Sequence, residues 1–593
     1  DTARVFTRQI GGTDAPTLIG PGTMPAWAPD GSGLVFQTSR KTLSVGGKDV
    51  APNEDFFPFP VRYLADGRFM YTADGKIRIR SATGGAPADV PFSATLTVRR
   101  PAINTQKDRG FNAMGPQPVR GISSPVISPD GQSVAFVALN DVWVMKIGQA
   151  PVRLTNDTAR DGSPQFTPDG RSVYFSTEKG NGGALAIDQV EIASKRRTRL
   201  AAIPAKSMVT PKMSPTGDRI TYTTGSGQLE IWDMASRTPQ TVIAQVSSQV
   251  STPSWLPDGK KVVLVDNERM NNRFREGYNK LRVIDIAGKT GTFHPVAQVP
   301  RQISDREEGA ATVSPDGTQV AFIMDSVLHV MPLKPDGSPA GPAVAITKEA
   351  ADLPSWAGDS RTILYKATEK LKTIGADGSG LREVPMNLSW TQAVAKGTTV
   401  IRAGRLWDGN SETLRTDVDI VIDGNRITAI RAHDASAARR ATKYIDASAF
   451  TVMPGLWDPH FHPLTLYQGG QFGQVAASML AYGITSTQSV AGPLHQSIEM
   501  RESLDAGNLI GPRLFVSPPL WEGNRLFYSF ARTLRTPEVA DMEIAKAKAM
   551  GADYLKSYVR APIPIMTKIA QAGLDMGIPT GTHMLAPGAA AGI

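Results

Sequence analysis

A short turn motif repeats along the first two-thirds of the 593-residue chain and constrains its fold more than any other feature. Each copy places a turn of Pro-Asp-Gly type before an apolar strand, and most copies are about forty residues apart. The third turn position is occupied by Asp30, Asp66, Asp130, Asp169, Thr216, Asp258, Asp316 and Asp359. In such turns proline presets φ, the aspartate side chain accepts hydrogen bonds and glycine adopts a positive φ. Regular spacing favours a structural role over a calcium-binding array.

The runs beside these turns alternate apolar and polar residues, as half-buried antiparallel strands do. Four short strands in a period of about 40–45 residues are typical of a β-propeller blade. Eight turn copies therefore predict an all-β propeller of seven or eight blades over residues 1–395. The pattern resembles the TolB-like repeats of bacterial propellers. Such a domain is expected to bind a partner or to control access to a neighbouring domain.

Composition narrows the possible partners and compartments. The chain has 64 basic and 55 acidic residues, a net charge of +9 that no basic block concentrates, so we expect no nucleic-acid partner. The absence of cysteine excludes disulfides, thiolate metal sites and cysteine nucleophiles. No apolar stretch reaches 18 residues, so we expect no membrane span. The chain begins at Asp1, without a methionine or a signal peptide, and we expect a processed protein that is periplasmic or secreted.

The pattern changes near residue 395. Two alternating runs flank the turn Asp423-Gly424-Asn425, which predicts a hairpin, and residues 396–453 are expected to form a small β-sandwich. Helical and strand patterns then alternate over residues 454–593. This alternation predicts a parallel sheet, interpreted as strands one to five of a (β/α)8 TIM barrel.

A His-x-His pair, His460 and His462, lies at the end of the first strand of this region. Residues i and i+2 of a strand share a face, so both imidazoles can approach one metal ion. The carboxyl ends of barrel strands are where such enzymes carry their sites. Asp458 is placed to orient one imidazole through its second nitrogen. A packed or solvated histidine pair is the alternative, and His495, after a Gly-Pro-Leu turn, is expected at the surface.

Three segments resemble the amidohydrolase superfamily, in its imidazolonepropionase-like and prolidase-like branch, some members of which carry a TolB-like propeller in front. Residues 452–463 resemble its first barrel strand, residues 551–556 the fourth and residues 581–583 the fifth. The resemblance implies two divalent metal ions, zinc above all, held by His460, His462 and His583 and bridged by a carboxylated Lys556. Tyr558, two residues beyond Lys556, is a candidate for contacting substrate.

The resemblance implies a metal-dependent hydrolase of amide or peptide bonds, with a small amide or peptide as substrate and the propeller controlling access. The alternative is a propeller-based binding protein with an inert hydrolase scaffold. The superfamily pattern also has a histidine on strand six and a catalytic aspartate on strand eight, which lie beyond Ile593. We therefore expect a second polypeptide, or a cleaved fragment, to supply strands six to eight, and a homo-oligomer is possible.

Overall fold

The computed structural model describes residues 3–38, 42–95, 97, 109–110, 113–243, 251–270, 276–463 and 472–583. The chain divides into two compact units, Asp1–Ala102 and Ile103–Ile593. The helices within the described residues are all too short or too polar to cross a bilayer.

The first unit is built from antiparallel strands. A two-stranded ribbon precedes two four-stranded sheets, whose facing sides bury Val35, Leu43, Phe69 and Tyr71. The strands are β1 (Arg4–Thr7), β2 (Thr17–Pro21), β3 (Thr23–Trp27), β4 (Leu34–Thr38), β5 (Thr42–Val45), β6 (Lys48–Asp49), β7 (Arg62–Tyr63), β8 (Phe69–Ala73), β9 (Lys76–Ser81) and β10 (Gly84–Val90).

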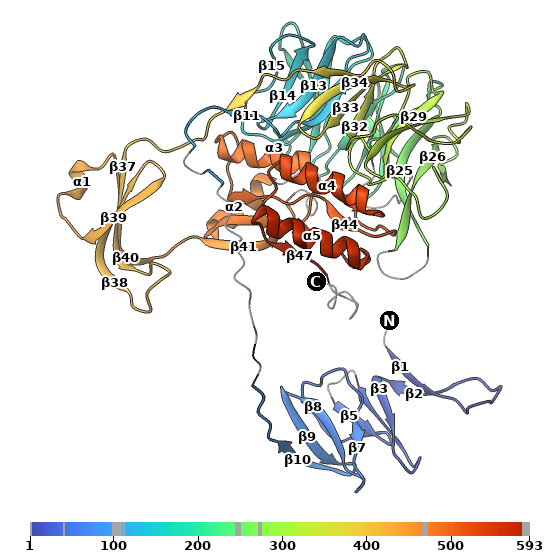
Figure 1. Cartoon of the computed structure of the whole chain (residues 1–593), viewed down its shortest axis with the longest axis vertical. Helices are drawn as coiled ribbons and strands as arrows, with labels where there is room; N and C mark the ends of the chain where they lie inside the picture. The colour runs from blue at the N-terminus through green and yellow to red at the C-terminus, as the bar shows by residue number, and fades with distance from the viewer. Residues whose placement is uncertain are drawn as a thin grey trace. The chain divides into compact units, whose positions relative to one another are not determined.

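Six four-stranded antiparallel sheets form a propeller ring in the second unit (Figure 1). In chain order its strands are β12 (Ser123–Ile127), β13 (Ser133–Ala138), β14 (Asp141–Lys146), β15 (Val152–Arg153), β16 (Asp161–Phe166), β17 (Ser172–Thr177), β18 (Ala186–Glu191), β19 (Arg197–Ala201), β20 (Val209–Met213), β21 (Arg219–Thr223), β22 (Leu229–Asp233), β23 (Thr238–Ile243), β24 (Ser254–Trp255), β25 (Lys261–Arg269), β26 (Gly277–Asp285), β27 (Thr290–His294), β28 (Ala311–Val313), β29 (Gln319–Met324), β30 (Val327–Pro332), β31 (Val344–Ala345), β32 (Asp352–Trp356), β33 (Thr362–Ala367), β34 (Lys370–Gly375) and β35 (Arg382–Val384).

The predicted turns join the first and second strand of each sheet. Between β12 and β13, for example, Gly131 has φ +73° and the Asp130 carboxylate accepts the N–H of Gln132 at 3.0 Å. The ring closes because β12 of the first sheet packs against β32 of the last, and β11 (Gln117–Pro118) pairs with β36 (Ser389–Trp390). Residues from both sheets share one core, including Phe136 and Leu364.

The prediction of seven or eight blades in one propeller is therefore wrong for the ring, which has six. The structure does contain eight four-stranded sheets with this turn, but those containing Asp30 and Asp66 belong to the first unit. Turn chemistry specifies each sheet, whereas ring membership depends on which apolar faces meet. The sequence repeat alone does not encode that choice.

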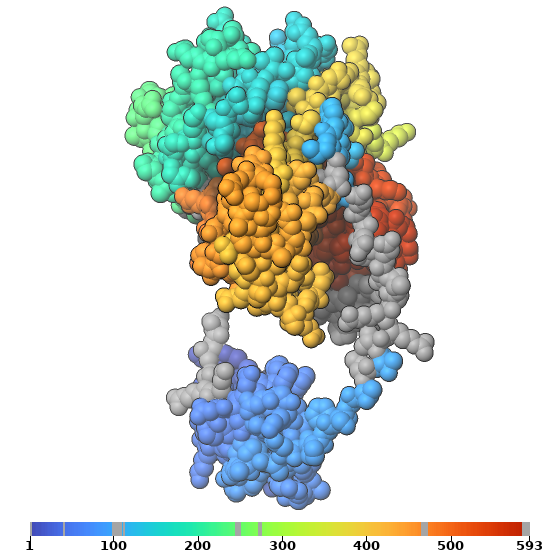
Figure 2. Space-filling model, turned by 90° about the vertical axis from the view of Figure 1, so that its left-hand side faces the viewer, coloured from blue at the N-terminus to red at the C-terminus, as the bar shows by residue number. Residues whose placement is uncertain are grey.

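The predicted β-sandwich is a single four-stranded sheet within the described residues, in the order β39-β38-β37-β40. Its elements are β37 (Thr398–Leu406), β38 (Arg415–Asp423), β39 (Arg426–Ala432), α1 (Ala437–Arg440) and β40 (Lys443–Val452). The predicted hairpin turn is confirmed, with Gly424 at φ +59°. One face buries Ala403 and Val418, while Ile427 and Phe450 remain exposed. The sheet, in light orange, faces the viewer in Figure 2. A second layer was expected from the alternating pattern, but a one-layer sheet with a small core satisfies the same pattern.

The last segment alternates strands and helices, as predicted. Its elements are β41 (Leu456–Phe461), α2 (Phe472–Ala481), β42 (Ile484–Ser489), α3 (Leu494–Asp505), β43 (Arg513–Phe515), β44 (Leu520–Glu522), β45 (Ala531–Thr533), α4 (Pro537–Ala549), β46 (Leu555–Lys556), α5 (Ile563–Met576) and β47 (Thr580–Gly581). All strand pairs here are parallel. They form three short sheets, and the described residues do not form a closed barrel.

Helix α3 seats this β/α segment on the propeller ring. Glu502 accepts the backbone N–H groups of Arg120 and Gly121 at 3.1 and 3.0 Å, and Glu499 accepts that of Asn140 at 2.6 Å. A Cβ atom on Gly121 would lie 2.3 Å from the backbone nitrogen of Glu499, so only glycine permits this approach.

A buried ionic cluster extends the contact between the ring and the segment. Arg532 pairs with Asp352 at 2.7 Å and with Glu543 at 2.8 Å, and it also pairs with Asp305. Lys546 pairs with Asp352 and Glu543 at 3.0 and 2.9 Å. Buried charges are retained only when paired in this way, so the cluster fixes the orientation of the segment on the ring.

Candidate functional site

The His-x-His pair lies at the carboxyl end of β41, as predicted. The strand pairs in parallel with β42, and Val490 donates its N–H to the carbonyl of Phe461 at 3.2 Å. The ring centroids of His460 and His462 are 5.5 Å apart, with the ring planes at 74°. Two imidazoles thus stand beside each other at one strand end.

The tautomer of His462 is set by a backbone carbonyl. Its Nδ1 lies 3.0 Å from the carbonyl oxygen of Ala491, which can only accept a hydrogen bond. Nδ1 therefore carries the proton, and Nε2 carries the lone pair that a metal ion requires. Burial lowers the pKa of His462, and the charges of His460 and Lys556 lower it further, while the Ala491 hydrogen bond opposes them. His462 is accordingly held neutral.

His460 is more exposed, and its backbone is fixed by Asp458. The Asp458 carboxylate accepts the His460 N–H at 3.0 Å, so it orients the chain at this residue instead of an imidazole. The prediction that Asp458 orients a ring is therefore corrected: an aspartate two residues before an N–H forms the local turn bond first. Partial burial lowers the pKa of His460, as does Lys556, whereas Asp458 raises it.

Lys556 is a buried amine without a salt bridge. It lies on β46, is 4% exposed, and has no hydrogen bond or ion pair within the described part of the chain. Desolvation lowers the pKa of its amine. Because its charge acts on both imidazoles, the three groups share one electrostatic environment.

His583 follows the neighbouring strand, β47, by two residues. Lys556 pairs with Gly581 in the parallel β46–β47 pair, and Ser557 donates its N–H to the Gly581 carbonyl at 3.0 Å. The His583 ring centroid is 4.6 Å from that of Tyr558, which is 2% exposed. Tyr558 therefore packs against His583, and its contact with substrate stays a prediction.

The four predicted ligands are only partly brought together. The imidazoles of His460 and His462 are neighbours, and the charge of Lys556 acts on both. The ring of His583 packs against Tyr558. Within the described ranges, no three His, Asp or Glu side chains are grouped so as to hold a metal ion. The Nε2 lone pair of the neutral His462 nevertheless has the donor chemistry that a divalent metal site needs.

Two further residues of the site were not predicted. Ala491 follows β42, and its contribution could have been inferred because the ends of adjacent parallel strands meet at one edge of a sheet. Phe530 lies 6.0 Å from the His462 ring, centroid to centroid, and comes from the connection between β44 and β45. No sequence signal marked this residue, since both short strands were missed.

The prediction that His495 lies at the surface is wrong. The residue is 6% exposed, and its Nε2 donates to Asp352 of the ring at 3.0 Å. Burial, opposed by the Asp352 hydrogen bond, lowers its pKa to about 4. A preceding Gly-Pro-Leu turn suggested a loop, but the turn leads directly into α3 beneath the propeller ring.

Comparison with known proteins supports the propeller. Residues 116–292 match the family model described as the TolB beta propeller domain. The chain is 26% identical over 211 residues to the Tol-Pal system protein TolB of Francisella tularensis, covering 34% of this chain and 45% of that protein. It is 25% identical over 156 residues to an uncharacterised protein of Agrobacterium fabrum, covering 23% of this chain and 52% of that protein. The chain thus spans about half the length of these relatives, and it carries a TolB-like β-propeller, as predicted.

Three solved structures each match part of the chain. TolB from Acinetobacter baumannii covers 55% of this chain and 79% of its own, with 15% identity and a TM-score of 0.34. The match to a Xaa-Pro dipeptidase with bound methionine covers 33% of this chain and 58% of the dipeptidase, with 22% identity and a TM-score of 0.29. The match to an amidohydrolase covers 33% of this chain and 58% of the amidohydrolase, with 18% identity and a TM-score of 0.29. The chemistry proposed for this chain therefore rests on its own residues.

Proposed function

We propose that the chain is a metal-dependent hydrolase of amide or peptide C–N bonds, with its reactive centre at the carboxyl ends of β41 and β46. One observation carries the proposal: a neutral His462 with its Nδ1 proton directed to Ala491 shares its surroundings with His460 and with the unpaired amine of Lys556. A lysine amine is rarely buried without an ion-pair partner unless the protein uses that amine in its chemistry.

His460, His462 and His583 would hold the metal ions through imidazole nitrogens, and Lys556 would bridge two of them as a carbamate. A divalent ion such as zinc supplies Lewis-acid activation of the scissile carbonyl and acidifies water. The role of Ala491 is to keep the Nε2 lone pair of His462 directed away from the strand. Phe530 and Tyr558 shield the two sides of the site from water.

Formation of the carbamate follows from the environment of Lys556. The neutral amine attacks the carbon of CO₂, a C–N bond forms, one C–O π bond opens to carry the negative charge, and the nitrogen proton leaves to solvent. Burial favours this step because it lowers the pKa of the ammonium group and enlarges the neutral fraction. The product is an anionic oxygen ligand.

The remaining expectations form part of the same proposal. The substrate is a small amide or peptide. The propeller controls access, and the protein acts in the periplasm or outside the cell. A homo-oligomer is compatible with this arrangement.

Metal and carbamate can be tested without a substrate. We expect zinc-reconstituted chain to bind two ions and, with ¹³C-bicarbonate, to show a carbamate resonance that Lys556→Ala abolishes. His460→Ala and His462→Ala should lower the zinc stoichiometry, whereas His294→Ala, a half-buried histidine on β27 of the ring, should not. Unchanged zinc binding in both site variants would refute the proposal.

A second candidate function is a propeller-based binding protein with an inert hydrolase scaffold. A polar cavity at the ring axis favours it. A chain that binds neither zinc nor CO₂ at Lys556, yet binds a ligand at the ring, would support this alternative.

A further inference from the structure

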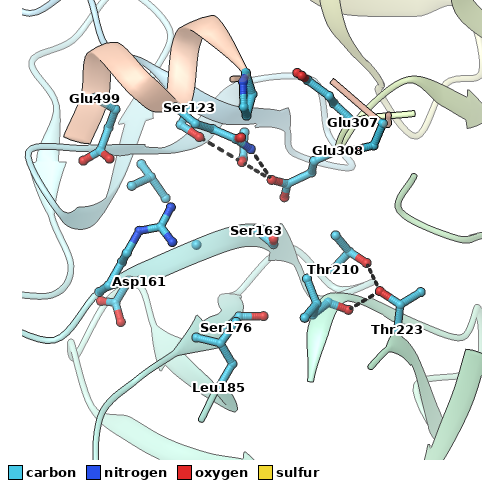
Figure 3. Close-up of a pocket in the computed structure, with 18 of the residues that line it drawn as sticks. Ser123, Asp161, Ser163, Ser176, Leu185, Thr210, Thr223, Glu307, Glu308 and Glu499 are labelled. Atoms are coloured by element: carbon cyan, nitrogen blue, oxygen red, sulfur yellow. Dashed lines mark hydrogen bonds between the residues drawn. The ribbon is translucent and has the colours of Figure 1, made fainter. Parts of the chain in front are cut away.

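A cavity of about 140 Å³ lies where the inner strands of the ring meet the β/α segment (Figure 3). Helix α3 contributes Gln496 and Glu499 to its wall, and the connection between β44 and β45 contributes Phe530. A water molecule occupies about 30 Å³ in the liquid, so the cavity has room for a small organic ligand. Hydroxyl groups line the ring side: Ser123, Ser124, Ser163, Ser176, Thr210 and Thr223.

Three of these hydroxyl residues occupy the same place in successive blades. Ser124, Ser163 and Thr210 each lie at a β-bulge of an inner strand, with φ between +49° and +52°. Bulges redirect side chains and are frequent beside binding sites. In each case proline follows, a repeated Ser/Thr-Pro pair four residues before the turn motif.

Glu308 brings an unpaired acceptor into this cavity. Its Oε2 accepts hydrogen bonds from Ser124 at 2.7 Å and from Gln496 at 3.2 Å. Its Oε1 is buried and has no hydrogen-bond partner in the described part of the chain. Figure 3 shows the carboxylate projecting into the open space. A buried acceptor left without a donor is destabilising, and a ligand N–H would satisfy it.

Arg160 provides a matching cation. It is half-buried and lines the same cavity, and its guanidinium has no hydrogen bond or ion pair with any described residue. Burial raises the pKa of Glu308 and of Glu499, and the charge of Arg160 opposes both shifts. Glu499 is already engaged by Asn140 and Ser503, at 2.6 and 2.7 Å. Glu308 and Arg160 therefore offer an acceptor and a cation of opposite charge to a ligand. Asp161 and Glu307 also have buried carboxylate oxygens without a hydrogen-bond partner among the described residues.

A metal ion fits this cavity poorly. Within the described ranges, no three acidic or histidine side chains converge closely enough to coordinate one. Asp161 faces Arg197 at 3.6 Å, and Glu307 lies within the field of Asp305, Arg532 and Lys546. The separated carboxylate and guanidinium suit a ligand that carries both charges.

We propose that the cavity binds the zwitterion of a free α-amino acid, with its ammonium group at Glu308 Oε1 and its carboxylate at Arg160. Val137 and Leu185 supply apolar contacts for its side chain. The inference goes beyond the proposed function and does not require hydrolysis. Phe530 nevertheless lines the cavity and lies 6.0 Å from His462, so a product amino acid would have a short path between the two sites; this link alone rests on the proposed function.

Calorimetry with three matched probes tests the proposal. We expect the chain to bind L-leucine at least tenfold more tightly than N-acetyl-L-leucine, which lacks the ammonium group, and than L-leucinamide, which lacks the carboxylate. Glu308→Gln should abolish the preference over N-acetyl-L-leucine, and Arg160→Gln the preference over L-leucinamide. Glu383→Gln, an exposed acid on β35, should change neither preference.

The outcomes separate this proposal from the hydrolase. If His460→Ala still binds leucine, the amino-acid site in the cavity is supported, regardless of the zinc stoichiometry of that variant. Equal affinity for all three probes, or leucine binding that both cavity variants retain, would overturn the proposal. Calcium binding that depends on Glu308 and displaces leucine would assign the cavity to a metal ion instead. If Glu308→Gln does not fold, the relative affinity of Arg160→Gln for L-leucine and L-leucinamide tests the proposal.

Discussion

Helix α3 and strand β41 belong to the same β/α segment but lie in opposite environments. Eight of the twelve residues of α3 are buried, among them His495, Glu499 and Glu502. Strand β41 leaves Leu456 48% and Trp457 49% exposed, although both are apolar. The difference shows that the segment is fixed through the polar residues that meet the propeller, while the strand that carries His460 is weakly packed. Stability and the candidate chemistry therefore depend on different elements.

The largest test of this contrast is Arg532→Met. The change leaves Asp305, Asp352 and Glu543 buried without their shared cation, and breaking such a cluster costs about 3–5 kcal/mol. Urea unfolding should show this loss. Arg535→Met removes one ion pair, with the partly exposed Asp325, and should cost less than half as much. Equal losses would show that the buried cluster does not hold the segment on the ring.

The pH dependence of stability should reveal Glu502. Burial raises its pKa from 4.5 to about 7, although the hydrogen bonds from the N–H groups of Gly121 and Arg120 lower it. Because the folded state holds this proton more tightly, the contribution is complete below pH 4.5 and is lost as pH rises through about 7. Between pH 5 and 8 the native chain should lose up to about 3 kcal/mol relative to Glu502→Gln.

Urea unfolding at pH 5, 6.5 and 8 measures this difference. Lys366, which acts on Glu502, is present in both proteins. Glu383→Gln, exposed on the ring, should follow the native curve. Parallel curves for native chain and Glu502→Gln would mean that Glu502 is not buried against the ring.

Gly121→Ala tests the close approach of α3. A methyl group there meets backbone atoms of Glu499 at 2.3 and 2.4 Å, so the helix must move, at a cost of about 1–3 kcal/mol. Gly115→Ala meets no atom within 4 Å and is the matched control. Thermal unfolding of both variants gives the comparison, and a Gly121→Ala protein as stable as its control would contradict the packing described.

The smallest effect is expected on β41. Leu456→Ala should change stability by no more than about 0.5 kcal/mol because the side chain is half exposed. The comparison partner is Ile498→Ala in α3, a fully buried residue whose truncation should cost about 2–5 kcal/mol. A large loss from Leu456→Ala would indicate that β41 is covered in solution.

Local patterns predicted most elements but not how they assemble. Turn residues such as Asp130 and Gly131 specify each blade, because their conformations depend only on neighbouring residues. Helix α3 lies where helical and strand patterns were predicted to alternate, yet its polar sequence hid its burial: His495 and Glu502 find partners more than a hundred residues away. The six-blade ring and Phe530 beside His462 arise from such long-range contacts and leave no periodic signal.

Anomalous diffraction at the zinc edge from crystals of the zinc-loaded chain tests the central proposal most directly. The account predicts a peak about 2.0–2.1 Å from Nε2 of His462 and bound also by His460, with density extending from Lys556 Nζ for a carbamate. A map with no zinc at these imidazoles, and an unmodified Lys556, would contradict it.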